Sequence, residues 1–488
     1  MKHLRRDQLT LRHAVSQATA LNAPGGTIVL YVSGTAALLT STFTSYPSGS
    51  YAIPLILLIS LVIYGLMTFS MYEFSKELSS SGGYYTFVSR GLGQRAGFIT
   101  ALSYLSYQIL SFTGFGILGF MGFVYDVFPS FGIQIPFPTF LWIPLSLVFI
   151  GVVSWLIYSG IRPSLQFVSY TIIVEVLFFI ATSLALIYEF HARLSLVPFT
   201  PKPVGNDTLA LATMMVYAIG TYVGIGGSIP IAEETRNPKR NVPLAILITI
   251  AVLGITIILS AYAQVISWGA QNMASFGGSQ FPYPVIYIYQ HDFGYISTAL
   301  VAVLIILVLN SFFTATVSLG TNATRVVFSL AREHVFPERL SSIHAVTGSP
   351  TKAIVLVAVL ASIITIGTGL AFEATSGTVN GLLNASVFLL ILESPITYLV
   401  HILTNTSLYS FMRKEGKRVS ILRHIVIPSV STLTLVFAVV VAVYLDLSPP
   451  YIYGIYGAIA VILAILITTL VVSTKSRRKL ELIGDFSL

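Results

Sequence analysis

The chain has 488 residues, of which 55% are hydrophobic and only 9% are charged, and its mean hydropathy is +0.85. No soluble domain has this balance, so the composition excludes soluble enzymes and binding modules and indicates a polytopic membrane protein. The sequence contains no cysteine, which excludes disulfides, thiolate metal sites and a thiol nucleophile.

Twelve apolar segments are long enough to cross a membrane, at roughly 20 residues per span. The predicted fold class is therefore an all-α polytopic membrane protein with twelve transmembrane helices. They are expected near residues 14–44, 51–72, 97–126, 141–159, 164–188, 209–232, 243–266, 296–330, 351–370, 380–404, 422–444 and 450–472.

Basic residues are distributed unevenly between the two sides of these spans. Of the 26 lysines and arginines, only Arg193 and Lys202 fall in segments predicted to lie outside. The positive-inside rule therefore predicts a multi-pass protein of the cell membrane with both termini in the cytoplasm. The net charge of +8 is a topology signal and does not indicate a nucleic-acid partner. The basic N-terminus lacks the compact apolar core of a cleavable signal peptide.

The first predicted span is interrupted near its middle. A short half-span, residues 11–21, precedes the break, and residues 27–43 continue to the outer surface. Proline and paired glycines at this depth remove a hydrogen-bond donor and loosen the backbone. The candidate site residues at this break are Asn22, Ala23, Pro24, Gly25, Gly26 and Thr27.

The sixth predicted span contains a second, glycine-rich break and then runs into a charged segment, residues 233–240. A broken membrane helix must line a cavity or be buried in protein, because lipid cannot satisfy the freed N–H and C=O groups. The candidate site residues at this break are Val223, Gly224, Ile225, Gly226 and Gly227.

Spans one and six occupy equal positions in two consecutive units of five spans. Interrupted helices at matched positions indicate a 5+5 inverted repeat with a binding site near the membrane midplane. The predicted organisation is a cytoplasmic N-terminal segment (1–13), the first five-helix repeat (14–188), an extracellular loop (189–208), the second five-helix repeat (209–404), helices 11 and 12 (405–472) and a cytoplasmic tail (473–488).

Four motifs in chain order resemble the amino acid–polyamine–organocation superfamily of LeuT-type permeases. Any one of them is a weak signal, but all four stand at the expected places relative to the predicted spans. They are Glu73 with Ser81-Gly82-Gly83-Tyr84 after span two, Gly93 to Phe98 before span three, Glu233-Glu234 with Arg236-Asn237-Pro238 after span six, and Asn322, Arg325 and Leu330 to Glu333 at the end of span eight.

The resemblance implies a secondary active transporter of the LeuT-type fold that works by alternating access. Two departures from the family pattern bear on the substrate. The first break reads Ala-Pro-Gly-Gly where many members have Gly-Ser-Gly, and the sixth break contains no acidic residue. A polyamine or cationic amino acid would need a buried carboxylate there.

The backbone of two broken helices suits a zwitterion. The outer half of span one begins at the break with unpaired N–H groups and a positive dipole end, which favour a carboxylate. Carbonyls at the end of an upstream half-helix favour an ammonium group. We therefore expect a neutral amino acid as the substrate, with Tyr107 and Tyr222 as candidate lining residues, although core packing explains any one tyrosine as well.

Glu175, in span five, is the candidate residue for coupling transport to an ion. An acidic residue inside a membrane span is costly and is a functional hypothesis by default. Burial disfavours the charged form, so this carboxyl could hold a proton in one state and lose it when water reaches it in the other. Sodium coupling through Thr314 and nearby hydroxyls of span eight, or a purely structural protonated Glu175, stay open.

The charged residues after span six are expected to form a cytoplasmic gate. Glu233, Glu234 and Arg236 lie beyond the apolar phase, next to Pro238, where a helix would end and the chain turn. Arg95 and Arg325 are candidate ion-pair partners. The alternative is a plain solvated loop.

Other classes of function have less support in the sequence. The residue patterns of membrane hydrolases are missing, so an enzyme is not expected, and neither is a cofactor. The first break lacks the carboxylate that a metal-ion transporter of this fold would need, so no metal site is expected. An exchange-type carrier of amines or other small organic solutes, or a transport-incompetent sensor, remains open.

Overall fold

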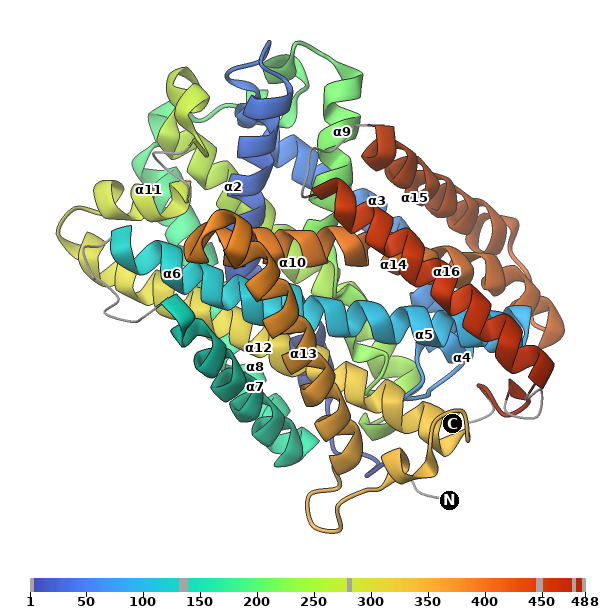
Figure 1. The fold of residues 1–488 in the computed structure, drawn as a ribbon. Coiled ribbons are helices and arrows are strands. Elements are labelled where there is room, and N and C mark those ends of the chain that lie inside the picture. Colours follow the sequence, from blue (N-terminus) through green and yellow to red (C-terminus); the bar gives the residue numbers. More distant parts are fainter. Residues whose placement is uncertain (1–3, 131–138, 279–282, 445–450, 476–479, 485–488) are drawn as a thin grey trace.

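The computed structural model describes residues 4–130, 139–278, 283–444, 451–475 and 480–484. Throughout these residues the regular structure is helical, and the β-structure found there is an isolated parallel bridge between Leu9 and Thr235. Figure 1 shows long helices crossing one another around a shared centre.

The α-helices begin and end at the following residues: α1 Leu11–Asn22, α2 Pro24–Thr42, α3 Ile53–Ser75, α4 Tyr84–Leu92, α5 Gln94–Ser111, α6 Phe120–Ser130, α7 Trp142–Tyr158, α8 Ile161–Glu189, α9 Thr208–Ile219, α10 Pro238–Trp268, α11 Pro284–Asp292, α12 Ser297–Arg332, α13 Thr351–Ser376, α14 Thr378–Lys414, α15 Ile427–Tyr444 and α16 Tyr451–Lys475. A π-helical segment, Phe112–Gly119, joins α5 to α6, and another, Leu422–Val426, precedes α15.

Within the described residues, ten helical segments are long and apolar enough to cross a membrane. Helix α7 is a shorter apolar helix of 17 residues. The first predicted span is divided between α1, with 12 residues, and α2, with 19 residues. A multi-pass all-helical fold is therefore confirmed, whereas the count of twelve spans and the inverted repeat stay predictions.

The broken first span lies at the centre of the molecule. Helix α1 packs against α8, α10 and α12, and α2 packs against α10 and α12. Helix α12 has 36 residues, which at about 1.5 Å per residue exceeds the ~30 Å hydrocarbon core of a bilayer. Helix α12 is therefore longer than a straight crossing of the hydrocarbon core requires.

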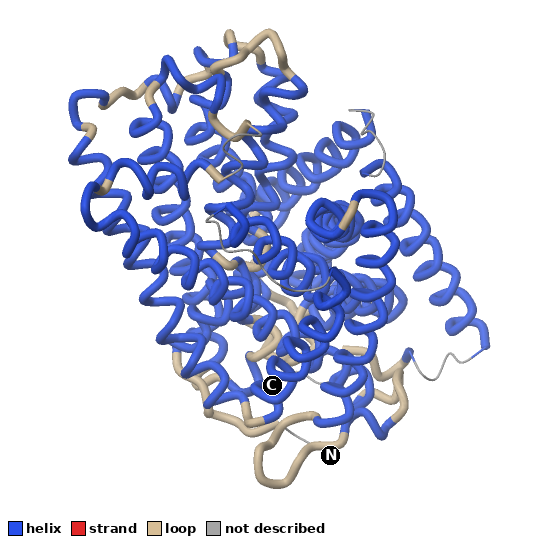
Figure 2. Tube along the Cα trace, turned by 60° about the vertical axis from the view of Figure 1, so that its left-hand side comes forward, coloured by secondary structure: helices blue, strands red, loops and turns tan. Residues whose placement is uncertain are grey.

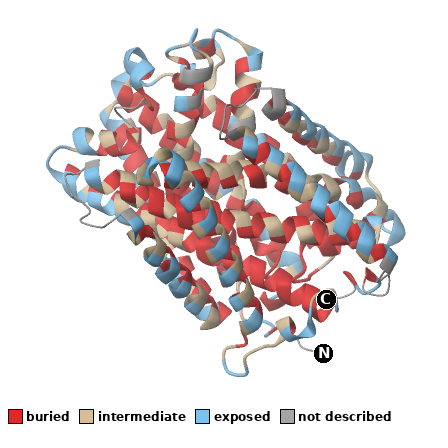
Figure 3. Ribbon diagram, viewed as in Figure 1, coloured by how far each residue is buried: buried red, intermediate tan, exposed pale blue. Residues whose placement is uncertain are grey.

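The outermost helices show apolar side chains on their exposed faces. Figure 3 shows exposed residues along the outer faces of α7, α15 and α16, whereas the centre is buried. Trp155 of α7, Leu433 of α15 and Leu470 of α16 are 66%, 68% and 63% exposed. Large apolar side chains facing outward on several helices are expected where lipid, rather than water, surrounds the protein.

Both ends of the described chain lie at the same end of the molecule, near α4 and the last turns of α12 (Figures 1 and 2). This arrangement agrees with an even number of membrane crossings. The side of the membrane on which they lie remains a prediction from the distribution of basic residues.

Cysteine labelling in this cysteine-free chain tests that prediction. We expect Asn237→Cys and Glu415→Cys, both at exposed positions, to resist a membrane-impermeant maleimide in intact cells and to react after permeabilisation. Lys202→Cys, exposed in the predicted outer loop, is the control that should react in intact cells. Labelling of position 237 or 415 from outside would contradict the topology.

Candidate functional site: two facing helix breaks

The first break is formed by Ala23 and Pro24. Ala23 lies in the left-handed region with φ 51°, which few residues other than glycine adopt without strain, and it separates α1 from α2. Pro24 then occupies the first position of α2, where its missing N–H costs no helical hydrogen bond. The local sequence therefore ends one helix and starts another at the centre of the protein.

The free N–H groups at the start of α2 are bound by side chains of α8 and α12. The N–H of Gly25 donates to Oε1 of Glu175 at 2.8 Å, and the N–H of Gly26 donates to Oγ of Ser311 at 3.2 Å. A Cβ on Gly25 would lie 3.1 Å from the same Glu175 oxygen, so glycine permits this close approach. The sequence analysis predicts that these N–H donors bind the carboxylate of a substrate. In the structure, the Glu175 carboxylate accepts the hydrogen bond from one of them, the N–H of Gly25.

Glu175 is fully buried, and its two carboxyl oxygens accept three hydrogen bonds. Besides the Gly25 N–H, Oε1 accepts from Ser311 Oγ at 2.7 Å, and Oε2 accepts from Asn310 Nδ2 at 3.4 Å. These hydrogen bonds and the positive end of α2 favour the ionised form of the Glu175 carboxyl, whereas its complete burial disfavours that form.

The second break lies between α9 and α10 and consists of short 3-10 turns. Gly224 has φ 114°, a conformation that favours glycine, and a Cβ there would lie 2.6 Å from Leu21 Cδ2 and 3.0 Å from the Asn22 nitrogen. The unwound segment of span six thus lies directly against the end of α1. The sequence prediction of two breaks is confirmed as a feature of the backbone.

Asn22 joins the two breaks. Its Nδ2 donates to the carbonyl oxygens of Thr221 and Val223, at 2.6 Å and 3.1 Å, and its Oδ1 is buried with no hydrogen-bond partner among the described residues. Thr27 Oγ1 donates to the carbonyl of Asn22 at 2.7 Å. Carbonyls suited to an ammonium group are therefore present at the site and are held by an amide of the protein.

The structure brings the candidate site residues of both breaks together and buries all of them except the half-buried Val223. Tyr222 is also buried, but its hydroxyl donates to the carbonyl of Leu57 at 3.1 Å and so points towards α3. The Tyr107 hydroxyl accepts from Gln108 Nε2 at 2.9 Å, and Thr314 donates to the carbonyl of Ser311 at 3.2 Å. The roles of these residues in binding stay predictions.

Sequence reasoning missed Tyr64 as a neighbour of the second break. Its hydroxyl lies beside the backbone of Gly224, and its buried ring meets that of His401 edge-on at 6.1 Å between centroids. In a chain with 26 tyrosines no local signal singles it out, because the contact depends on how α3 packs against span six.

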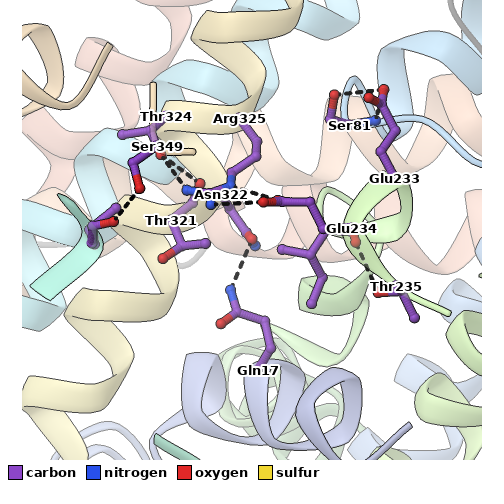
Figure 4. Close-up of polar contacts among 12 residues, drawn as sticks. Gln17, Ser81, Glu233, Glu234, Thr235, Thr321, Asn322, Thr324, Arg325 and Ser349 are labelled. Carbon is purple, nitrogen blue, oxygen red and sulfur yellow. Dashed lines mark hydrogen bonds and ion pairs between the residues drawn. The ribbon is translucent and has the colours of Figure 1, made fainter. Parts of the chain in front are cut away.

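A buried cluster of ion pairs lies on the side of the site where α1 begins. Glu234 pairs with Arg325 at 3.1 Å, and Glu233 forms a bidentate pair with Arg332 at 2.8 and 2.9 Å. Ser81 adds two hydrogen bonds to Glu233, at 2.9 and 2.8 Å. Figure 4 shows Glu234 and Arg325 pointing toward each other, with Gln17 of α1 reaching Asn322. The cluster therefore connects α1, the segment after span six, α12 and the loop before α4.

Arg236 is not part of this cluster. Its side chain is exposed, and its Nε donates to the carbonyl of Asp7 at 2.8 Å. The chain turns at Asn237, which has φ 45°, so Arg236 faces the N-terminal segment instead of the two glutamates. The cations that pair with them come from α12, and Arg332, about 100 residues away in sequence, was not expected as a partner.

The N-terminal segment is bound to the same region through its backbone. The N–H groups of Gln8 and Leu9 donate to the carbonyl of Glu234 at 2.9 and 3.0 Å, and the Arg236 N–H donates to the carbonyl of Leu9 at 2.8 Å. These bonds form the parallel bridge between Leu9 and Thr235. The beginning of α1 and the segment after span six are thus tied together.

A family model for amino acid permeases matches residues 28–483. The chain belongs to the amino acid permease family. The resemblance seen in the four sequence motifs is thereby confirmed, and the family indicates a transporter rather than an enzyme.

Two curated relatives match parts of this permease. It is 25% identical over 247 residues to an uncharacterized transporter of Rhizobium meliloti (strain 1021), covering 49% of this chain and 50% of the relative. It is 24% identical over 303 residues to the branched-chain amino acid permease BcaP of Bacillus subtilis (strain 168), covering 56% and 58%. The match thus spans about half the length of each curated relative.

Among solved structures, the permease is similar in fold to MhsT, crystallised in complex with L-phenylalanine. The TM-score is 0.60 at 13% sequence identity, and the match covers 91% of this chain and 100% of MhsT. At this identity the likeness concerns the fold, and it supports the LeuT-type architecture inferred from the sequence.

Removing one partner from a buried ion pair should destabilise the permease strongly. We expect Arg325→Met to lower the free energy of unfolding by about 3–5 kcal/mol, because Glu234 would remain buried without its counter-charge. Arg236→Met, at an exposed position outside the cluster, should cost about 0–1 kcal/mol. Unfolding of the purified protein in detergent measures both, and equal losses in the two variants would contradict the assignment.

Proposed function

We propose that this permease is a secondary active transporter that moves neutral amino acids by alternating access and couples their movement to protons. Family membership supports amino acid transport. The names of the similar proteins support an apolar side chain, because one is a branched-chain amino acid permease and the other was crystallised with L-phenylalanine. The observation that carries the coupling is the Glu175 carboxylate at the N-terminus of α2.

In this proposal the substrate replaces hydrogen bonds that the protein now makes to itself. Its carboxylate takes the N–H donors of Gly25 and Gly26, and its ammonium group takes the carbonyls of Thr221 and Val223. The amide of Asn22 must leave those carbonyls, and Glu175 must release Gly25. Backbone ligands of this kind recognise the amino acid group that all α-amino acids share.

Competition for the Gly25 N–H links the proton to the substrate. A charged Glu175 would oppose a second carboxylate at the same helix end, because like charges at close distance repel. A protonated Glu175 carries no charge, so it would leave the positive end of α2 to the substrate. Proton and amino acid would therefore bind together, and the two together would bias the conformational equilibrium in the direction of release.

The buried ion pairs are assigned the role of the cytoplasmic gate. Glu233 and Glu234 hold the segment after span six against α12, and Gln17 holds α1 against the same helix through Ser318 and Asn322. A path from the breaks to the cytoplasm would need these contacts to part. Arg236 would act only indirectly, through its bond to the N-terminal segment.

Filling either break should abolish substrate binding. We expect Gly25→Leu and Gly226→Leu to lose the stabilisation that a neutral amino acid gives the purified protein, as measured by thermal shift with leucine and phenylalanine. A Cβ on Gly226 would lie 2.0 Å from the Tyr84 hydroxyl, so this side chain must move. Gly367→Leu, where a Cβ meets nothing within 4 Å, is the control. Unchanged affinity in both site variants, with wild-type melting in the absence of substrate, would locate the site elsewhere.

Replacing the Glu175 carboxylate by an amide should separate binding from coupling. In the wild type we expect amino acid affinity to rise as the pH falls, because protonation frees the end of α2. Glu175→Gln, which is neutral at every pH, should bind with little pH dependence, should catalyse exchange, and should fail to accumulate substrate under an imposed pH gradient in proteoliposomes. Glu189→Gln, exposed at the outer end of the same helix, is the matched control.

The same vesicles distinguish sodium coupling from proton coupling. In the sodium alternative, Thr314 and Ser311 would contribute oxygens to the ion together with the first break. Uptake that requires a sodium gradient, ignores the pH gradient and is unaffected by Glu175→Gln would overturn the proton proposal.

A further inference from the structure

A polar hollow of about 670 Å³ lies between the end of α3 and the connection from α14 to α15. None of its lining residues belongs to either helix break. It is lined by Glu73, Lys76, Glu77, Met412, Lys417, Arg418, Val419, Ser420, Arg423 and His424. The basic residues of the α14–α15 connection belong to the predicted cytoplasmic side. The proposed transport mechanism uses none of these residues.

The two lysines of the hollow form ion pairs, and its two arginines do not. Lys76 bridges to Glu73 at 2.8 Å, and Lys417 bridges to Glu77. The two glutamates are thus each matched by a lysine. Within the part of the chain that the structure describes, the guanidinium groups of Arg418 and Arg423 form no ion pair or hydrogen bond, and both residues are exposed. The hollow therefore presents excess positive charge in the form of guanidinium groups.

Apolar residues continue from this charge in the direction of the membrane. Ile421 and Leu422 are 71% and 61% exposed, and Ile425 and Val426 are also exposed. Leu422, Ile425 and Val426 lie on the π-helical segment Leu422–Val426, and Ile421 directly precedes it. The segment leads into α15, which also carries exposed apolar side chains such as Leu433. Cationic and apolar groups thus lie side by side at the start of a predicted membrane span.

We propose that this hollow binds the headgroup of an anionic phospholipid from the cytoplasmic leaflet. The planar guanidinium group matches the oxygens of a phosphodiester, and basic pockets between transmembrane helices on the cytoplasmic side suit anionic headgroups. The exposed side chains of Ile421, Leu422 and Ile425 would contact the acyl chains. A free phosphate ion shares the headgroup chemistry but would make no use of these apolar residues.

Native mass spectrometry of the full-length protein in detergent tests the proposal. Dioleoyl phosphatidylglycerol is titrated against dioleoyl phosphatidylcholine, and the bound fraction is read from the mass of the complex. We expect the anionic lipid to bind in preference, and Arg418→Gln/Arg423→Gln to weaken its binding roughly tenfold or more. Arg339→Gln/Lys352→Gln removes the same charge at exposed cytoplasmic positions outside the hollow and should leave binding unchanged.

Three results would overturn the proposal: equal binding of the two lipids, equal weakening in the two double variants, or displacement of the lipid by millimolar inorganic phosphate. The last would identify a free anion as the occupant. If the double variant does not elute as a folded species, the single variants Arg418→Gln and Arg423→Gln give the same comparison. Because the readout is lipid binding, it is independent of whether the proposed transport activity is correct.

Discussion

The centre of this permease depends on one constraint: a helix interrupted inside an apolar protein must find partners for the backbone groups that the interruption frees. At the first break, Glu175 and Ser311 accept from the N–H groups of Gly25 and Gly26. At the second, the amide of Asn22 satisfies two carbonyls. Side chains from three different helices are therefore required at the breaks, and this requirement explains why α8 and α12 pack so closely around α1.

In the proposed function, the bonds that stabilise the breaks are also the bonds that a substrate replaces. The carboxylate of an amino acid could replace that of Glu175, and its ammonium group could replace the amide N–H groups of Asn22. Little net hydrogen bonding would be lost in the exchange, so the protein need not store a large amount of strain to keep the site ready. The main energetic cost of the exchange would be the repulsion between the charged Glu175 and the substrate carboxylate. Protonation of Glu175 would remove this repulsion.

The parts of this architecture that depend on local backbone chemistry were predictable from the sequence. Proline and glycine at residues 24–26 and glycine at 224 locate the breaks, because these residues decide where a helix can continue. Contacts between distant segments were harder to predict. No feature of the neighbouring sequence indicates which residues Arg332 and Tyr64 contact. Arg236 was expected to join Glu233 and Glu234 only because it is close to them in sequence. Such pairings follow from the crossing of long helices, which periodicity alone does not fix.

If the protein works by the proposed alternating access, the backbone bridge between Leu9 and Thr235 constrains how this end of the protein can open. Three main-chain hydrogen bonds join the residues just before α1 to the segment after span six, and they favour joint movement of α1 and that segment. Separate movement would break those bonds, whereas joint movement would leave them intact and change the backbone angles at the two breaks, near Ala23 and Gly224. Residues 4–10, which precede α1, would then couple these two segments to each other, and deleting them would loosen this end of the protein without changing any residue of the two breaks.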